Sequence, residues 1–125
     1  MREIKFRVWD TVTKKMYLDV GLFPNSSNAF EENNYEGFFI NPSRNGVFKL
    51  MQFTGLHDKN GNPIWEGDIL RPLDVIRSPY KVYWGNYGWE VENIKDIFFK
   101  WQFLWDHSWE VIGNIYENPE LLEVL

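Results

Sequence analysis

The sequence of 125 residues contains no cysteine, and this absence excludes disulfide bonds and thiolate metal sites. Only two histidines are present, His57 and His107, and they lie far apart in the chain. Each stands beside an aspartate, but neighbouring residues of a strand point to opposite faces. The glycines are dispersed rather than clustered before a helix, so no phosphate-binding loop is indicated. We therefore expect no metal and no cofactor.

Long apolar runs are also absent. No stretch approaches the roughly 20 residues that a membrane-spanning helix requires. The opening "MREIKFRVWD" lacks the apolar core of a signal peptide. Together with the missing cysteines, these features predict a cytoplasmic protein that does not contact a membrane.

Basic residues are outnumbered, with 13 lysines and arginines against 18 acidic residues and a net charge of −5. Because nucleic-acid binding depends on neutralising phosphates, this balance argues against a dedicated DNA or RNA binder. A local basic face is nevertheless compatible with an acidic protein. Lys5 and Arg7 would share one face of a strand, with Lys14 and Lys15 in the next turn and Trp9 available for stacking. A nucleic-acid-binding β-barrel is therefore the alternative hypothesis.

Aromatic residues are abundant, at 18% of the chain with seven tryptophans. Aromatic side chains bury large areas, are enriched at protein interfaces and also stack on bases or sugars. We expect most of them in the core and a further share at an interface with another subunit or protein. The candidate interface residues are Trp9, Trp65, Trp84, Trp101 and Trp105.

Alternating apolar and polar residues predict a mostly β protein. The first twenty residues have the pattern of a hairpin, and residues 47–53 are apolar on both faces, as in a central strand. Further strands are predicted at 80–84 and 108–116, and a long loop at about 21–37. Seven or eight short strands separated by turn signals favour one barrel-like or sandwich domain.

Turn chemistry accounts for several polar residues and glycines. Asn60-Gly61 favours a tight reversal, and Gly67 is expected at a bulge where Asp68 accepts backbone hydrogen bonds. Gly113 is expected at a second bulge, inside the strand at 108–116. The predicted structural turn and bulge residues are thus Asn60, Gly61, Gly67, Asp68 and Gly113.

The C-terminal third is less uniform. Residues 93–107 have helical spacing but are rich in strand formers, which favours a short helix or irregular turn leading into a strand. Asn118-Pro119 predicts a capping asparagine followed by a short terminal helix or turn.

One carboxylate pair has a spacing that catalysis uses. Glu66 and Asp68 are two residues apart on one strand face if no bulge intervenes, and Trp65 is available for sugar stacking. Two such acids flank the scissile bond in glycosidases. The competing interpretation is that Asp68 binds backbone donors and Glu66 is solvated. We favour the second, so a carboxylate-dependent hydrolase ranks third and no enzyme is expected.

Three separated stretches together resemble the YopX family of small phage and prophage proteins. They are "MREIKFRVWD" followed by "KKM", then "LMQFTGLHDKNGNPIWEGDIL", and finally "EVIGNIYENPELL". The loop at 21–37 and residues 71–109 are not diagnostic, and Trp65 stands where the family usually has tyrosine. The resemblance implies a predominantly β fold with an SH3-like barrel component, a phage or prophage origin and self-association. It implies no established catalytic activity.

The sequence therefore predicts one YopX-like domain over residues 1–125. The expected fold is mostly β, with an SH3-like barrel component, additional β-hairpins and a short C-terminal helix or turn. The expected function is that of a phage or prophage accessory protein in the bacterial cytoplasm. It would act as a non-enzymatic protein-interaction or self-assembling module, as a homo-oligomer or by contacting a host or phage protein.

Overall fold

The computed structural model describes residues 4–18, 20–22, 30–32, 38–40, 47–72, 79–95 and 101–123. For 20–22, 30–32, 38–40 and 101–102 it describes the backbone alone. The described chain is built from strands β1 to β12 and a short 3-10 helix, which confirms the predicted mostly β class. Contacts between Cα atoms group it into two compact units, Met1–Phe53 and Thr54–Leu125.

The first unit begins with the predicted hairpin. Strand β1 (Phe6–Asp10) pairs antiparallel with β2 (Lys15–Tyr17) and, on its other side, with residues 48–52 of β6 (Phe48–His57). The carboxylate of Asp10 closes the turn by accepting the backbone N–H groups of Val12 and Thr13, at 2.8 and 3.1 Å. Hydrogen bonds of this kind are why aspartate favours turns.

Three short strands form a second sheet in this unit. Strand β5 (Phe38–Ile40) lies between β3 (Val20–Leu22), which is parallel to it, and β4 (Phe30–Glu32), which is antiparallel. The stretch predicted as a long loop at 21–37 thus contains β4 and the end of β3. Its residues 23–29 and 33–37 lie outside the described part of the chain.

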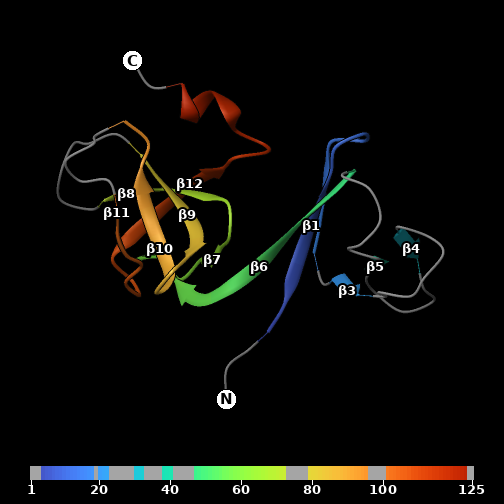
Figure 1. The fold of residues 1–125 in the computed structure, drawn as a ribbon, viewed down its shortest axis with the longest axis horizontal. Helices are drawn as coiled ribbons and strands as arrows, with labels where there is room; N and C mark the ends of the chain where they lie inside the picture. The colour runs from blue at the N-terminus through green and yellow to red at the C-terminus, as the bar shows by residue number, and fades with distance from the viewer. Residues whose placement is uncertain are drawn as a thin grey trace. The chain divides into compact units, whose positions relative to one another are not determined.

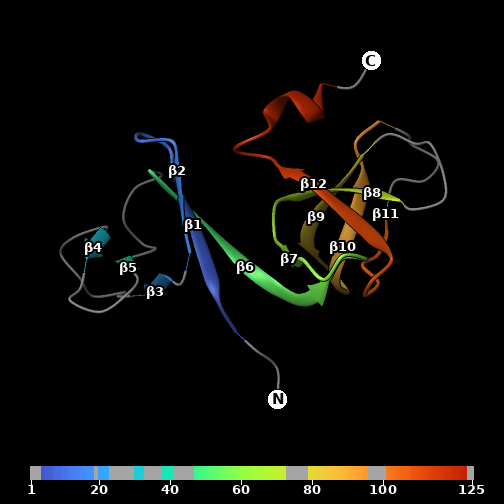
Figure 2. The same ribbon diagram turned by 180° about the vertical axis from the view of Figure 1, so that it is seen from behind.

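The second unit contains a five-stranded antiparallel sheet in the order β11-β10-β9-β8-β12. Figures 1 and 2 show this sheet curling into a half-barrel, with β12 crossing at one side. Its strands are β8 (Asp68–Pro72), β9 (Tyr80–Gly85), β10 (Gly88–Asn93), β11 (Trp101–Phe103) and β12 (Trp109–Asn114). Strand β7 (Pro63–Trp65) lies beside β6, whose last four residues belong to this unit.

The core of this unit lies against one face of the curled sheet. Val82 pairs with Val91 across β9 and β10, and both are essentially fully buried. The rings of Tyr80 and Trp109 meet edge to face, with their centroids 5.0 Å apart. The remaining buried members of the cluster are Ile64, Leu70 and Leu104. Large aromatic and aliphatic side chains therefore provide most of the burial that stabilises the half-barrel.

The predicted turn residues lie as follows. Gly61 has φ +85° in the turn after Asn60, and Gly67 has φ +86° in the turn between β7 and β8 rather than at a bulge inside a strand. Asp68 accepts the backbone N–H of Trp65 across that turn, at 2.8 Å. Gly113 lies at a register shift in the pairing of β12 with β8. At the positive φ values of Gly61 and Gly67, glycine is the residue that is free of strain.

The C-terminal segment ends as a 3-10 helix, Pro119–Leu122, which confirms the predicted short helix or turn. Asn118 does not cap it, so that detail was wrong. Its Oδ1 instead accepts the backbone N–H of Asn114, 3.1 Å away. The earlier ambiguous stretch contains the end of β10 and then β11, and residues 96–100 fall outside the described part.

Within the described ranges, no helix has both the length and the apolar character needed to cross a membrane.

Candidate interaction surface

The carboxylate pair singled out in the sequence occupies the turn between β7 and β8. Asp68 is 2% exposed and its Oδ2 accepts the Trp65 N–H, so it holds the turn together. Glu66 is half-buried, and its charge adds to burial in raising the pKa of Tyr116. Neither carboxylate lines the two hollows described below. The geometry thus gives Asp68 a structural task.

The two histidines, distant in sequence, are brought together. Their rings stack with centroids 6.2 Å apart. The backbone N–H of His107 donates a hydrogen bond to the backbone carbonyl of His57, at 2.7 Å. Asp106 accepts the backbone N–H of His57 through its carboxylate, at 2.8 Å. Among the residues that the structure describes, no three histidine or acidic side chains are grouped to hold a metal ion. The pair joins the end of β6 to the segment before β12.

The five candidate interface tryptophans differ in how much of each side chain is exposed. Trp9 and Trp65 are each 7% exposed and so present little surface. Trp84 and Trp105 are 58% and 59% exposed. The side chain of Trp101 lies outside the described part of the chain. Only Trp84 and Trp105 are therefore seen to offer an aromatic ring to a partner.

The residues of the nucleic-acid hypothesis differ in exposure: Lys14 and Lys15, which follow β1 in the chain, are exposed, whereas those on β1 are covered. Arg7 is 7% exposed, and Trp9 is equally buried. The ammonium group of Lys5 lies 4.7 Å from the centre of the Phe53 ring, in a cation–π contact. Within β1, all of which the structure describes, no basic side chain is exposed.

A row of three side chains crosses the sheet of the second unit. Glu90 on β10 is directly opposite Tyr83 on β9 and Phe103 on β11. Residues directly opposite each other point to the same face, and successive residues alternate. Since Val82 and Val91 face the core, this row lies on the other side, called here the outer face.

Glu90 is 4% exposed although it lies on the outer face. Its Oε2 accepts the backbone N–H of Tyr87 in the β9–β10 turn, at 3.0 Å. Burial, a hydrogen bond to Glu90 and the negative charges of Glu90 and Glu92 raise the pKa of Tyr83 to about 12. A Cβ atom on Gly85 would collide with the Glu90 carboxylate, so only glycine leaves room for it there.

A hollow of about 400 Å³ opens at this carboxylate, and it is called here the Glu90 hollow. Its lining residues are Tyr83, Trp84, Gly85, Asn86, Tyr87 and Glu90. Tyr87 is 71% exposed, and Trp84 packs edge to face against Trp89 with centroids 4.9 Å apart. Phe103 is opposite Glu90 on β11, and its ring packs edge to face against Trp105 with centroids 6.3 Å apart. A carboxylate beside exposed aromatic rings is a combination typical of ligand-binding hollows.

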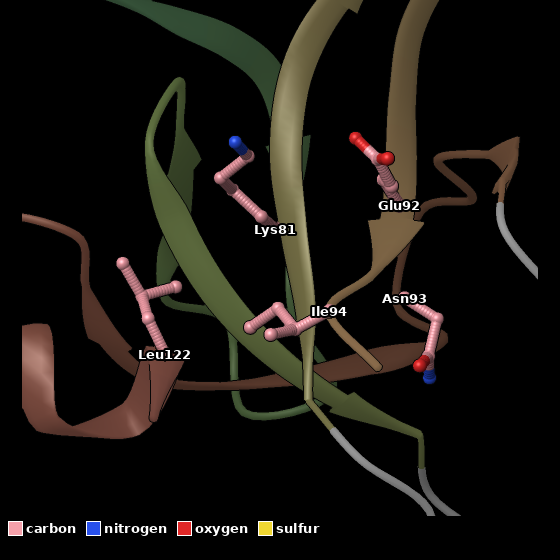
Figure 3. Close-up of a pocket in the computed structure, with 5 residues that line it drawn as sticks. All are labelled: Lys81, Glu92, Asn93, Ile94 and Leu122. Atoms are coloured by element: carbon pink, nitrogen blue, oxygen red, sulfur yellow. The ribbon is translucent and has the colours of Figure 1, made fainter. Parts of the chain in front are cut away.

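A smaller hollow of about 160 Å³ lies farther along the outer face. Lys81 and Glu92 are opposite each other across β9 and β10, and Figure 3 shows both side chains rising from the same side of the sheet. In that view Ile94 and Leu122 point toward one another, while Asn93 turns away. The opposite charges of Lys81 and Glu92 offset each other, so this hollow has no evident chemical task.

Sequence reasoning found Trp84 and Trp105 but missed Tyr83, Tyr87 and Glu90. The signal available was the turn Gly85-Asn86-Tyr87-Gly88 between two strand patterns. Pairing those strands across the turn places Tyr83 opposite Glu90, as the structure shows. The contribution of Phe103 depends on the pairing of β11, which no local pattern specified.

Comparison with known proteins identifies relatives over nearly the whole chain. The model of the family described as "YopX protein" matches residues 5–123. The crystal structure of protein EF1440 from Enterococcus faecalis is similar with a TM-score of 0.62 and 30% identity, covering 98% of this chain and 99% of that one. The structure of protein yopX from Bacillus subtilis has a TM-score of 0.56 and 18% identity, covering 100% and 99%. At 18% identity, the similarity to the Bacillus subtilis protein shows that the two chains have the same fold. No curated protein matches the chain by sequence.

Proposed function

This chain belongs to the YopX family, and from that premise we propose that it is a non-enzymatic protein-interaction module whose contact surface is the exposed aromatic cluster. This cluster consists of Trp84, Tyr87, Phe103 and Trp105. The proposal includes the accessory role in a phage or prophage that the family resemblance implies, and the cytoplasmic location expected from the sequence.

The observation that carries the proposal is the exposure of four large aromatic residues within one unit. They are between 41% and 71% exposed, whereas Trp109 and Tyr80 in the core of that unit are almost completely buried. Trp84 and Tyr87 line the Glu90 hollow, and Phe103, which is opposite Glu90 on β11, is in ring contact with Trp105. Tryptophan and tyrosine are the residues most enriched among interface hot spots.

The non-enzymatic part of the proposal is supported by what the candidate catalytic groups do. Asp68 is occupied by the Trp65 N–H, and the Glu90 carboxylate by the Tyr87 N–H and the Tyr83 hydroxyl. These hydrogen bonds give both buried acids a structural role, Asp68 in the β7–β8 turn and Glu90 at the β9–β10 turn.

Site-specific photocrosslinking in the producing bacterium tests the contact surface. The photoreactive residue p-benzoylphenylalanine is placed at Tyr87 or at Trp105, and the control position is Val12, which is 72% exposed but belongs to the first unit. We expect a discrete crosslinked band from both aromatic positions and none from Val12. A band at twice the 15.0 kDa chain mass would identify a second copy, and any other mass a different protein.

Equal crosslinking at Val12, or no band from either aromatic position, would refute the proposed surface. Light scattering decides the self-association component separately. A strict monomer at concentrations of roughly tens of micromolar, where a weak dimer of standard interface size assembles, would remove the homo-oligomer and leave only a different partner protein.

A further inference from the structure

We infer that the Glu90 hollow receives the guanidinium group of an arginine side chain presented by the partner protein. This inference rests on the proposed function, because it specifies the chemistry that the aromatic surface recognises. It concerns a site that lies entirely within the second unit, on the outer face of the half-barrel.

The first argument is the position of the Glu90 charge. Glu90 as a whole residue is 4% exposed, and the two partners of its carboxylate, the Tyr87 N–H and the Tyr83 hydroxyl, are neutral donors. Over the described ranges, no lysine or arginine forms an ion pair with it. A buried charge is costly unless an opposite charge or strong hydrogen bonds compensate it. A cation entering the hollow would supply the missing charge.

The second argument is the capacity of the carboxylate. Two carboxylate oxygens together offer about four acceptor positions, and the two neutral donors occupy only two of them. The remaining positions are sufficient for the two parallel N–H donors of a guanidinium group, which bind a carboxylate in fork geometry. A lysine ammonium has no such planar match.

The third argument is the aromatic character of the residues around the carboxylate. Tyr83 and Tyr87 line the hollow beside Glu90, and Phe103 flanks Glu90 from β11. Planar guanidinium groups stack on aromatic faces, and the rings attract cations through their quadrupole. An apolar side chain would contact the same rings, but it would exclude water from the carboxylate without supplying a positive charge.

The surrounding charge is compatible with a basic segment. Glu92 lies two residues along β10 on the same outer face, and the chain carries a net charge of −5. Lys81, on the same face, is opposite Glu92, so these two charges offset each other and leave Glu90 as the unbalanced one. At about 400 Å³ the hollow is within the range of ordinary ligand pockets, which begins near 300 Å³.

The test is an NMR titration of the ¹⁵N-labelled full chain with two peptides of the same shape. One is acetyl-Gly-Arg-Gly-amide, and the other carries citrulline, the neutral isostere of arginine, in the same position. We expect saturable shifts of the Gly85, Tyr87 and Gly88 amides with an affinity of roughly millimolar for the arginine peptide. The citrulline peptide should bind at least about tenfold more weakly, because it lacks the charge.

Variants locate the effect at the carboxylate. Glu90→Gln keeps an acceptor for the Tyr87 N–H but removes the charge, and we expect it to weaken arginine binding about tenfold. The matched control is Glu92→Gln, which removes the same charge two residues away and should change the affinity less than about threefold. Because Glu90→Gln alters a buried group, Tyr87→Leu serves as a second variant that removes an exposed ring and leaves the carboxylate in place.

Each result decides the inference. Equal binding of the two peptides, unchanged binding by both Glu90→Gln and Tyr87→Leu, or no shift at about ten times the expected dissociation constant would overturn it. If crosslinking at Tyr87 succeeds while the peptides show no preference, the interaction surface stands and the arginine specificity is rejected. If the arginine peptide binds but no crosslink forms, the proposed protein partner is rejected instead.

Discussion

The carboxylate of Asp58 holds the β6–β7 turn against β12, and removing it should destabilise the protein strongly. The residue is fully buried and accepts four hydrogen bonds. Two come from the backbone N–H groups of Asn60 and Asn62, at 2.9 and 2.8 Å, and one from the Asn62 side chain. The fourth comes from the Val111 N–H on β12, 3.1 Å away.

The loss of stability expected for Asp58→Ala depends on whether water can replace the carboxylate at each of these donors. Asn60 and Asn62 are exposed, so water can replace the carboxylate at their N–H groups. The Val111 N–H lies inside a strand and would remain without an acceptor, which costs about 1–3 kcal/mol. Lost charge-assisted bonds in the turn add to this, so we expect a decrease of about 2–4 kcal/mol in the free energy of unfolding.

The same contacts predict a pH dependence. Burial pushes the pKa of Asp58 upward, but the hydrogen bonds from Val111, Asn62 and Asn60 outweigh it, so the pKa lies below its ordinary value of 3.8. The unfolded chain therefore binds the proton at higher pH than the folded protein does. The stabilisation is complete above about pH 4 and is lost as the pH falls through the lowered pKa. Wild type and Asp58→Ala should thus converge in stability in strong acid.

Urea denaturation followed by tryptophan fluorescence, at neutral pH and at about pH 3, measures both effects. Asp106→Ala is the matched control, because Asp106 is 47% exposed and binds one backbone N–H at the surface. We expect the control to lose less than about 1 kcal/mol. A loss below about 0.5 kcal/mol for Asp58→Ala, or a difference from wild type that does not shrink in acid, would refute this account of the turn.

Three further changes test other parts of the structure. Thr54→Val removes a buried hydroxyl that donates to the Ile64 carbonyl at 2.7 Å, and chemical denaturation should show a loss of about 1–2 kcal/mol. Gly61→Ala meets no atoms but forces alanine to φ +85°, so the melting temperature should fall by an amount equivalent to about 1–2 kcal/mol. Ultraviolet titration should find Tyr83 ionising near pH 12. Glu90→Gln removes a hydrogen bond and a charge but leaves the burial, so it should lower this pKa in part, and a spectrum unchanged by Glu90→Gln would contradict the assignment.

Local patterns in the sequence were sufficient for much of the fold. The hairpin over the first twenty residues follows from alternation interrupted by one polar turn, and β6 covers the apolar run at 47–53. Proline after Asn118 located the terminal 3-10 helix correctly. In each case a signal within a few residues decides the local structure, and tertiary packing did not reverse it.

Features that depend on distant pairings were not predictable in this way. Strand β4 has only three residues, too few to show alternation, and it needs β5 as its partner. The stacking of His57 on His107 requires the end of β6 to meet the segment before β12. Asn118 has the sequence of a helix cap, yet its side chain is taken by Asn114.

The candidate site was predicted only in part for the same reason. Trp84 and Trp105 were chosen for their chemistry, which is visible in the sequence. Trp65 was chosen on the same ground and is 7% exposed, because composition does not say which face of a strand is covered. Glu90 gains its importance from two strands that place aromatic rings on both sides of it.

The hydrogen bond from Val111 to Asp58 joins residues 53 positions apart, and this separation bears on the order in which the second unit folds. The pairings of β8 with β9 and of β9 with β10 follow the order of the chain, so these neighbours meet early. The return of β12 to β8 and to the Asp58 turn closes a much longer loop. Non-local closures of this kind slow folding. We therefore expect the pairings of β8 with β9 and of β9 with β10 to form before β12 joins β8.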